Sequence, residues 1–115
     1  MVKSRARKGA NSTSRTAPVE ASSKTQVEKC RLAAFQPEFF DDMNYWLSTD
    51  AKTAKKIWNL VKEVLKTPFT GTGKPEALKY LSPNTWSRRI NEVDRLVYVV
   101  FDDKIEFHQA KGHYS

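Results

Sequence analysis

Apolar residues recur along the chain with helical spacing in two segments, which predicts two consecutive helices. The first begins at Pro37, and its apolar side chains follow at intervals of three and four at Phe39, Phe40, Met43, Trp46 and Leu47. Asp50 is a residue type suited to capping a helix N-terminus, so it predicts the start of the second helix. Thr67-Pro68 ends that helix, because proline disfavours helical geometry in the residue before it. The apolar face of the second helix comprises Ile57, Leu60, Val61, Val64 and Leu65.

The lysines of the second helix fall outside its apolar face. They are Lys52, Lys55, Lys56, Lys62 and Lys66. A solvated helix face and a stripe that contacts RNA are both open interpretations. We prefer the solvated face, because polar residues opposite an apolar stripe are the ordinary pattern of a helix packed on a core.

The rest of the chain predicts strands. Residues 32–35 form a short strand before the first helix, residues 68–75 form a structured Pro/Gly loop, and strands follow at 85–91, 96–101 and 104–112. Asp102-Asp103 predicts a tight turn, so the last two strands pair antiparallel. Both faces of 96–101 are apolar, which indicates a central strand. This order predicts an α+β domain in which two N-terminal helices pack on a small antiparallel β-sheet.

Charge and aromatic residues divide the chain into two parts. Its 115 residues carry a net charge of +7, with eight Lys or Arg and two Glu in residues 1–31. Residues 32–115 hold twelve Lys or Arg and eleven acidic residues, and every aromatic side chain lies between Phe35 and Tyr114. We therefore expect a disordered basic arm over residues 1–30 and one folded domain over residues 31–115. The positive charge favours a polyanion such as nucleic acid over a membrane.

The cellular setting that the sequence predicts is the cytoplasm. Cys30 is the single cysteine, so no intramolecular disulfide can form. No stretch is apolar enough to predict a transmembrane helix, and the first residues lack the apolar core of a secretory signal.

The second half of the chain contains the chemical groups that metal-free RNA cleavage requires. Glu76 is a candidate base, Arg95 a candidate cation for the phosphate, and His113 a candidate acid. From the residues alone, we prefer to interpret Glu76 as an ordinary surface acid. For Arg95, a salt bridge to Asp94 or Glu92 is as good an interpretation as phosphate binding. Tyr114 beside His113 either contacts RNA or packs on the protein. No Cys, His or Asp spacing predicts a metal site, and no cofactor is expected.

The segments GTGKPEALK and WSRRINEVDRLVYVV, followed by the C-terminal GHY, resemble the YoeB toxins of the RelE-like superfamily over about residues 31–115. The resemblance implies the RelE-like α+β fold and a ribosome-dependent messenger-RNA endonuclease of a type II toxin–antitoxin system. It assigns Glu76 as the general base, Arg95 as the group that stabilises the charged phosphorane, and His113 as the general acid. Tyr114 would stack on a base or orient the phosphate. The expected products carry a 2′,3′-cyclic phosphate or 3′-phosphate and a 5′-hydroxyl.

Further basic residues would bind the RNA: Lys74, Lys79, Arg89 and Lys111. Arg88 and Arg89 point to opposite faces of a regular strand, and the resemblance favours Arg89 for the RNA side. Arg88 then shares the core face with Trp86 and Ile90, whereas His108 in the last strand is interpreted as structural. Residues 81–85 replace the glycine-containing turn more usual in the family.

The resemblance also implies partners: a homodimer, a YefM-like antitoxin, the ribosome with its messenger RNA, and operator DNA together with the antitoxin. A non-catalytic co-repressor that binds nucleic acid with an antitoxin is the alternative function. The presence of Glu76, Arg95 and His113 together disfavours it. For residues 1–30, capture of ribosomal RNA and an inert extension are both open, and we prefer the inert extension.

Overall fold

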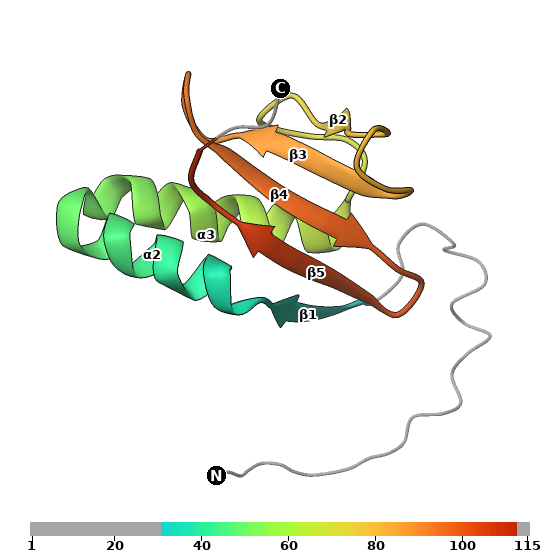
Figure 1. Cartoon of the computed structure of the whole chain (residues 1–115), viewed down its shortest axis with the longest axis horizontal. Coiled ribbons are helices and arrows are strands. Elements are labelled where there is room, and N and C mark those ends of the chain that lie inside the picture. The colour runs from blue at the N-terminus through green and yellow to red at the C-terminus, as the bar shows by residue number, and fades with distance from the viewer. Residues whose placement is uncertain (1–30, 113–115) are drawn as a thin grey trace, which may run out of the picture.

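The computed structural model describes residues 31–112. The predicted arm (residues 1–30), Cys30, His113 and Tyr114 therefore lie outside the described residues. In chain order the elements are β1 (Leu32–Phe35), α2 (Pro37–Thr49), α3 (Ala51–Lys66), β2 (Glu76–Ala77), β3 (Thr85–Arg89), β4 (Arg95–Val100) and β5 (Lys104–Gln109). This arrangement confirms the predicted fold class of two helices packed on a small, mainly antiparallel sheet (Figure 1).

The five strands form one sheet in the order β1-β5-β4-β3-β2. Strands β4 and β5 pair antiparallel, as the turn at Asp102-Asp103 predicted, and so do the pairs β3–β4 and β2–β3. Strand β1 instead pairs parallel with β5, with Leu32 opposite Lys104. The sequence predicted neither this parallel pair nor the two-residue strand β2. Strand β4 lies at the centre of the sheet, as its two apolar faces indicated.

The ends of the helices follow the signals in the sequence. Pro37 occupies the first turn of α2, where its missing N–H costs no hydrogen bond. Asp50 caps α3, and its carboxylate accepts hydrogen bonds from the backbone N–H of Thr53 at 3.3 Å and from the Thr53 hydroxyl at 2.8 Å. Neither helix is long and apolar enough to cross a membrane, and this finding concerns the described residues alone.

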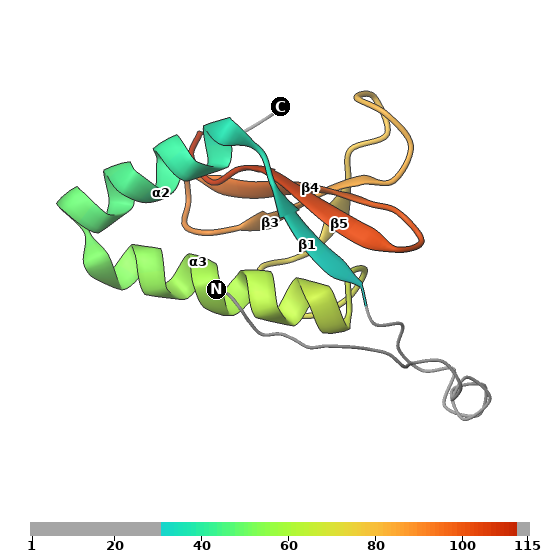
Figure 2. The same ribbon diagram turned by 90° about the horizontal axis from the view of Figure 1, so that it is seen from below.

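The core lies between the helices and one face of the sheet. Figure 2 shows α3 running along one side of the sheet. The buried apolar residues of α3 face Leu96, Tyr98 and Val100 of β4 and the apolar residues of β5 in one cluster. Phe39, Met43 and Trp46 of α2 join this cluster, whereas Phe40 and Leu47, which belong to the same apolar stripe, are 53% and 58% exposed. Only part of the apolar stripe of α2 is therefore buried.

The turn before β3 contains an asparagine with a left-handed backbone conformation. Asn84 adopts φ +63, a left-handed conformation that asparagine tolerates better than most other residues. Its carbonyl accepts a hydrogen bond from the backbone N–H of Val100 at 3.0 Å. Asn84 therefore provides a left-handed turn residue immediately before β3 without a glycine.

Candidate active site

The loop that leads to Glu76 is fixed by a buried arginine. Arg88 has no exposed surface, and its guanidinium donates hydrogen bonds to the carbonyls of Thr67 at 2.6 Å, Thr70 at 2.8 Å and Thr72 at 3.2 Å. Its Nε donates to the Tyr98 hydroxyl at 3.2 Å. The sequence placed Arg88 on the core face of β3 but gave it no role. The sequence feature that could have indicated this role is a charged residue between Trp86 and Ile90 on an otherwise apolar strand face.

Two further side chains hold the same loop. The carboxylate of Glu63 on α3 lies 3.6 Å from Arg88 and accepts hydrogen bonds from the backbone N–H and hydroxyl of Thr72 at 3.1 and 3.2 Å. The Tyr98 hydroxyl donates to the Pro68 carbonyl at 2.7 Å, and burial raises the pKa of Tyr98 above 10.0. The chain therefore enters β2 from a loop that is tied to α3, β3 and β4.

Glu76 and Arg95 form an ion pair across the sheet. The Glu76 Oε1 and the Arg95 Nη1 are 3.4 Å apart, and the two side chains are 62% and 18% exposed. The structure thus brings two predicted site residues together from segments distant in the sequence. Arg95 does not form the alternative salt bridge with Asp94 or Glu92. Because its guanidinium is mostly shielded from water, its attraction for an anion is screened less than that of a surface charge.

Strand register shows which other side chains share this face. Arg89 lies directly opposite Arg95, and Ser87 lies opposite both Glu76 and Val97. Residues directly opposite in an antiparallel pair project from the same face, so these side chains lie on the face away from the helices. Two like charges opposite each other are unfavourable unless an anion lies nearby. The Ser87 hydroxyl and the Arg95 Nε are buried and have no hydrogen-bond partner within residues 31–112.

The chain that precedes His113 is anchored at the same end of β4. The Gly112 carbonyl accepts a hydrogen bond from the Arg95 backbone N–H at 2.8 Å, and the Gly112 N–H donates to the Asp94 carboxylate at 2.7 Å. Two residues earlier, the Ala110 N–H donates to the Asp42 carboxylate at 2.8 Å. Burial raises the pKa of Asp42 above 3.8. The described chain therefore ends beside Arg95, one residue before the predicted general acid.

Comparison with known proteins decides the family. A family profile described as "YoeB-like toxin of bacterial type II toxin-antitoxin system" matches residues 35–114. The chain belongs to this YoeB-like toxin family. It is 48% identical over 77 residues to Toxin YoeB of Escherichia coli strain K12, covering 67% of this chain and 92% of that toxin.

Solved structures of the family agree with this assignment. The YoeB dimer from Staphylococcus aureus is 39% identical, with a TM-score of 0.68 and coverage of 75% of this chain and 100% of that chain. The YoeB–YefM complex from the same organism is 41% identical, with a TM-score of 0.64, and covers 73% of this chain and 99% of that chain. The resemblance to the YoeB toxins and the RelE-like fold are thereby confirmed.

The remaining candidate residues of this YoeB-like chain are more widely distributed. Lys74 and Arg89 line one cavity of about 410 Å³. Lys79 is exposed in the segment that follows β2, and the Lys111 ammonium lies 4.6 Å from the centre of the Tyr45 ring on α2. His108 lies 3.1 Å from Glu106 within β5, and this contact is the largest cause of the lowered pKa of Glu106. This partner is consistent with a structural His108.

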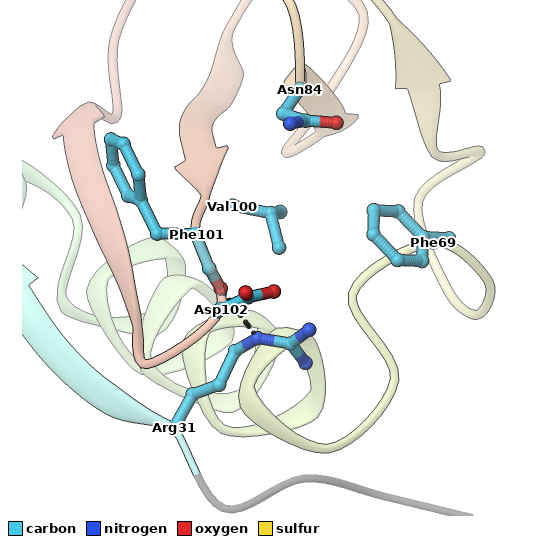
Figure 3. Close-up of a pocket in the computed structure, with 6 residues that line it drawn as sticks. All are labelled: Arg31, Phe69, Asn84, Val100, Phe101 and Asp102. Atoms are coloured by element: carbon cyan, nitrogen blue, oxygen red, sulfur yellow. Dashed lines mark hydrogen bonds between the residues drawn. The ribbon is translucent and has the colours of Figure 1, made fainter.

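A second cavity, of about 340 Å³, lies at the opposite end of β4 from Arg95 (Figure 3). Arg31, Phe69, Asn84, Val100, Phe101 and Asp102 line it. The Arg31 Nε donates a hydrogen bond to the Phe101 carbonyl at 2.8 Å, so this bond joins two of the lining residues. None of the candidate residues of the YoeB-like site lines this cavity, so it is distinct from the Glu76–Arg95 face. Within residues 31–112, no group of three or more His, Cys, Asp or Glu side chains is placed to hold a metal ion.

Proposed function

We propose that this YoeB-like toxin is a ribosome-dependent messenger-RNA endonuclease that acts in the cytoplasm. The observation that carries the proposal is the contact between the Glu76 carboxylate and the Arg95 guanidinium on the face away from the helices. A carboxylate that accepts protons and a fixed guanidinium that binds phosphate oxygens are two of the three groups that metal-free cleavage requires. The third, His113, follows Gly112, whose carbonyl accepts a hydrogen bond from Arg95.

Cleavage would proceed by attack of a 2′-hydroxyl on the neighbouring phosphate. Glu76 takes the hydroxyl proton, the 2′-oxygen bonds to phosphorus, and Arg95 stabilises the negative charge of the phosphorane. The bond from phosphorus to the 5′-oxygen then breaks, and His113 donates a proton to that oxygen. Tyr114 would orient the phosphate or stack on a base. The products carry a 2′,3′-cyclic phosphate, which hydrolyses to a 3′-phosphate, and a 5′-hydroxyl.

The family relationship also supports two protein partners. One staphylococcal relative was solved as a dimer and another in complex with YefM. We propose that this chain likewise forms a homodimer and binds a YefM-like antitoxin. With that antitoxin it would also contact operator DNA.

Purified ribosomes programmed with a defined message test the proposed reaction. The full-length protein should cleave the message, and the downstream fragments should accept a labelled phosphate from polynucleotide kinase without prior dephosphorylation, because their 5′ ends are hydroxyls. A message with a 2′-deoxynucleotide at the cleavage position should stay intact. Glu76→Gln keeps the size of the side chain but loses the charge, so it should cleave much more slowly.

The same experiment separates cleavage from the co-repressor alternative. A protein that binds operator DNA with an antitoxin but leaves programmed messages intact would refute the proposed reaction. Fragments with 5′-phosphate ends, or cleavage of the deoxy-substituted message, would refute attack by the 2′-hydroxyl.

A further inference from the structure

The cavity of about 410 Å³ lies between α3, the loop before β2 and the turn after β3. Residues of all three segments line it, among them Lys56, Gly73, Lys74, Arg89, Asn91 and Glu92. We infer that it binds a phosphodiester group of RNA and that Lys56 is a specific determinant of this binding. The inference rests on the proposed action on ribosomal messenger RNA. It goes beyond that proposal because it assigns a second phosphate site, away from the Glu76–Arg95 pair.

Lys56 differs from the other lysines of α3. The sequence placed all five on a solvated face, and all five are exposed, but Lys56 is the one that lines the cavity. Its ammonium donates a hydrogen bond to the Ile90 carbonyl at the end of β3. An ammonium has three donors, so two remain available for phosphate oxygens. The Ile90 carbonyl thus holds the charge at the cavity wall.

The opposite wall is held in place by close backbone contacts. The Arg89 N–H donates to the Gly73 carbonyl at 2.6 Å. Gly73 adopts φ +86, and a Cβ at this position would lie 3.0 Å from the Arg89 carbonyl oxygen and 3.2 Å from the Arg88 Cβ. Glycine is therefore required for the loop to approach β3 this closely. Lys74, with φ +50, follows directly and lines the same cavity. The site exists before any ligand arrives, which lowers the cost of binding.

The charge of the lining residues identifies the ligand class. The residues that line the cavity include three cationic residues, Lys56, Lys74 and Arg89, and one acidic residue, Glu92. A lining with a net positive charge favours an anion, and lysine and arginine are the residues that bind phosphates. Arg89 also lies opposite Arg95 in the sheet, so an RNA chain held at Arg95 passes close to the cavity. The phosphodiester belongs either to the messenger beside its cleavage site or to ribosomal RNA.

Two binding measurements distinguish these sources. One probe is a single-stranded RNA oligonucleotide made uncleavable by 2′-O-methyl groups, and the other is a small ribosomal subunit without messenger. The variant is Lys56→Gln in the full chain, and Lys55→Gln is the matched control, because Lys55 is an adjacent, exposed lysine of the same helix. Each affinity is measured between about 50 and 200 mM salt.

Lys56→Gln should weaken binding of one probe roughly fivefold, the usual scale of a single exposed charge contact. It should also reduce the slope of log affinity against log salt by about 0.7, because one phosphate contact is lost. Lys55→Gln should leave both quantities near wild type. A loss confined to the oligonucleotide assigns the site to messenger RNA, and a loss confined to the subunit assigns it to ribosomal RNA.

Equal affinities and salt slopes for Lys56→Gln and Lys55→Gln on both probes would overturn the inference. If losing the bond to Ile90 unfolds Lys56→Gln, then Lys74→Gln gives the same test from the other wall of the cavity. Both probes are bound without being cut. A wild-type protein that binds them through Lys56 but cleaves no programmed message would therefore refute the proposed function and leave the phosphate site in place.

Discussion

Replacing Arg88, the buried arginine of β3, by methionine should destabilise the fold substantially. Methionine keeps the unbranched side chain that packs in the core but removes every hydrogen-bond donor. The change leaves the carbonyls of Thr67, Thr70 and Thr72 and the Tyr98 hydroxyl without the partner they have in the folded protein. It also leaves Glu63 without the guanidinium that lies 3.6 Å away.

The expected cost follows from these contacts. A buried polar group that loses its partner costs about 1–3 kcal/mol, and the loop carbonyls fall toward the low end because they can be rehydrated. The variant no longer has to bury a guanidinium, which offsets part of the loss. Arg88→Met should therefore lower the free energy of unfolding by about 3 kcal/mol. For a domain of this size, that loss corresponds to a fall in Tm of roughly 12–24 °C.

Urea unfolding followed by tryptophan fluorescence measures this loss. Trp86 is a suitable reporter, because its ring centre lies 5.1 Å from that of Phe69 in the loop that Arg88 holds. Arg89→Met is the matched control: the neighbouring arginine is exposed, so its loss should change stability by at most about 0.5 kcal/mol. At a temperature where both variants stay folded, Arg88→Met should also cleave messenger RNA more slowly, since the loop it holds leads to Glu76.

A small effect would refute this reasoning. If Arg88→Met were as stable as wild type, the cost of burying the guanidinium would equal the benefit of its hydrogen bonds. If it were less stable but cleaved at the wild-type rate while folded, the loop would not position Glu76.

Four further changes test other parts of the molecule. Arg95→Lys keeps the positive charge but loses the planar guanidinium, so we expect the variant not to cleave messenger RNA on programmed ribosomes. Near-normal cleavage would mean that Arg95 contributes only its charge. His113→Ala should keep its circular dichroism spectrum and lower cleavage at least about a hundredfold, and full activity would remove His113 from the mechanism. Burial raises the pKa of Asp42 above 3.8, so the folded protein holds the carboxyl proton of Asp42 more tightly than the unfolded chain does. The contribution of Asp42 to the free energy of unfolding therefore falls as pH rises from the pKa of the unfolded state through the pKa of the folded state. Asp42→Asn should therefore gain stability relative to wild type as pH rises from about 3 to 7 in urea titrations, and a difference independent of pH would contradict this. Deleting residues 1–30 should leave Tm unchanged, because these residues contain no aromatic side chain with which to build a core. Equal ribosome affinity of the full-length and truncated proteins at low salt would identify these residues as an inert extension.

Local signals in the sequence predicted much of the fold. The apolar periodicity of α3, its cap at Asp50 and the turn between β4 and β5 depend on residues close in sequence, and all three were confirmed. The parallel pairing of β1 could not be predicted in this way, because it depends on a strand at the other end of the domain. Strand β2 is too short to show alternation. The exposure of Phe40 was not predicted, because periodicity gives the direction of an apolar stripe but not how much of it is buried.

The candidate site was predicted as a set of residues rather than as an arrangement. The resemblance to a family named Glu76 and Arg95, but from the residues alone Arg95 had its neighbours Asp94 and Glu92 as equally good partners. The register of β2, β3 and β4 instead brings Arg95 to Glu76, and it frees Asp94 to bind Gly112. The hydrogen bonds of Arg88 and of Lys56 could not be predicted, because their acceptors include backbone carbonyls of segments distant in the sequence.

The parallel pair of β1 and β5 has a consequence for the order in which the domain folds. The contacts between α2 and α3, and those along β3, β4 and β5, join neighbours in sequence and close short loops. Strand β1 can pair only after the last strand is in place, and closing so long a loop costs more entropy. It is also held on one edge alone, and Leu32 is 76% exposed. We therefore expect β1 to join the sheet last and to detach first. A force or partner acting on the chain before Leu32 would therefore reach the domain first through β1.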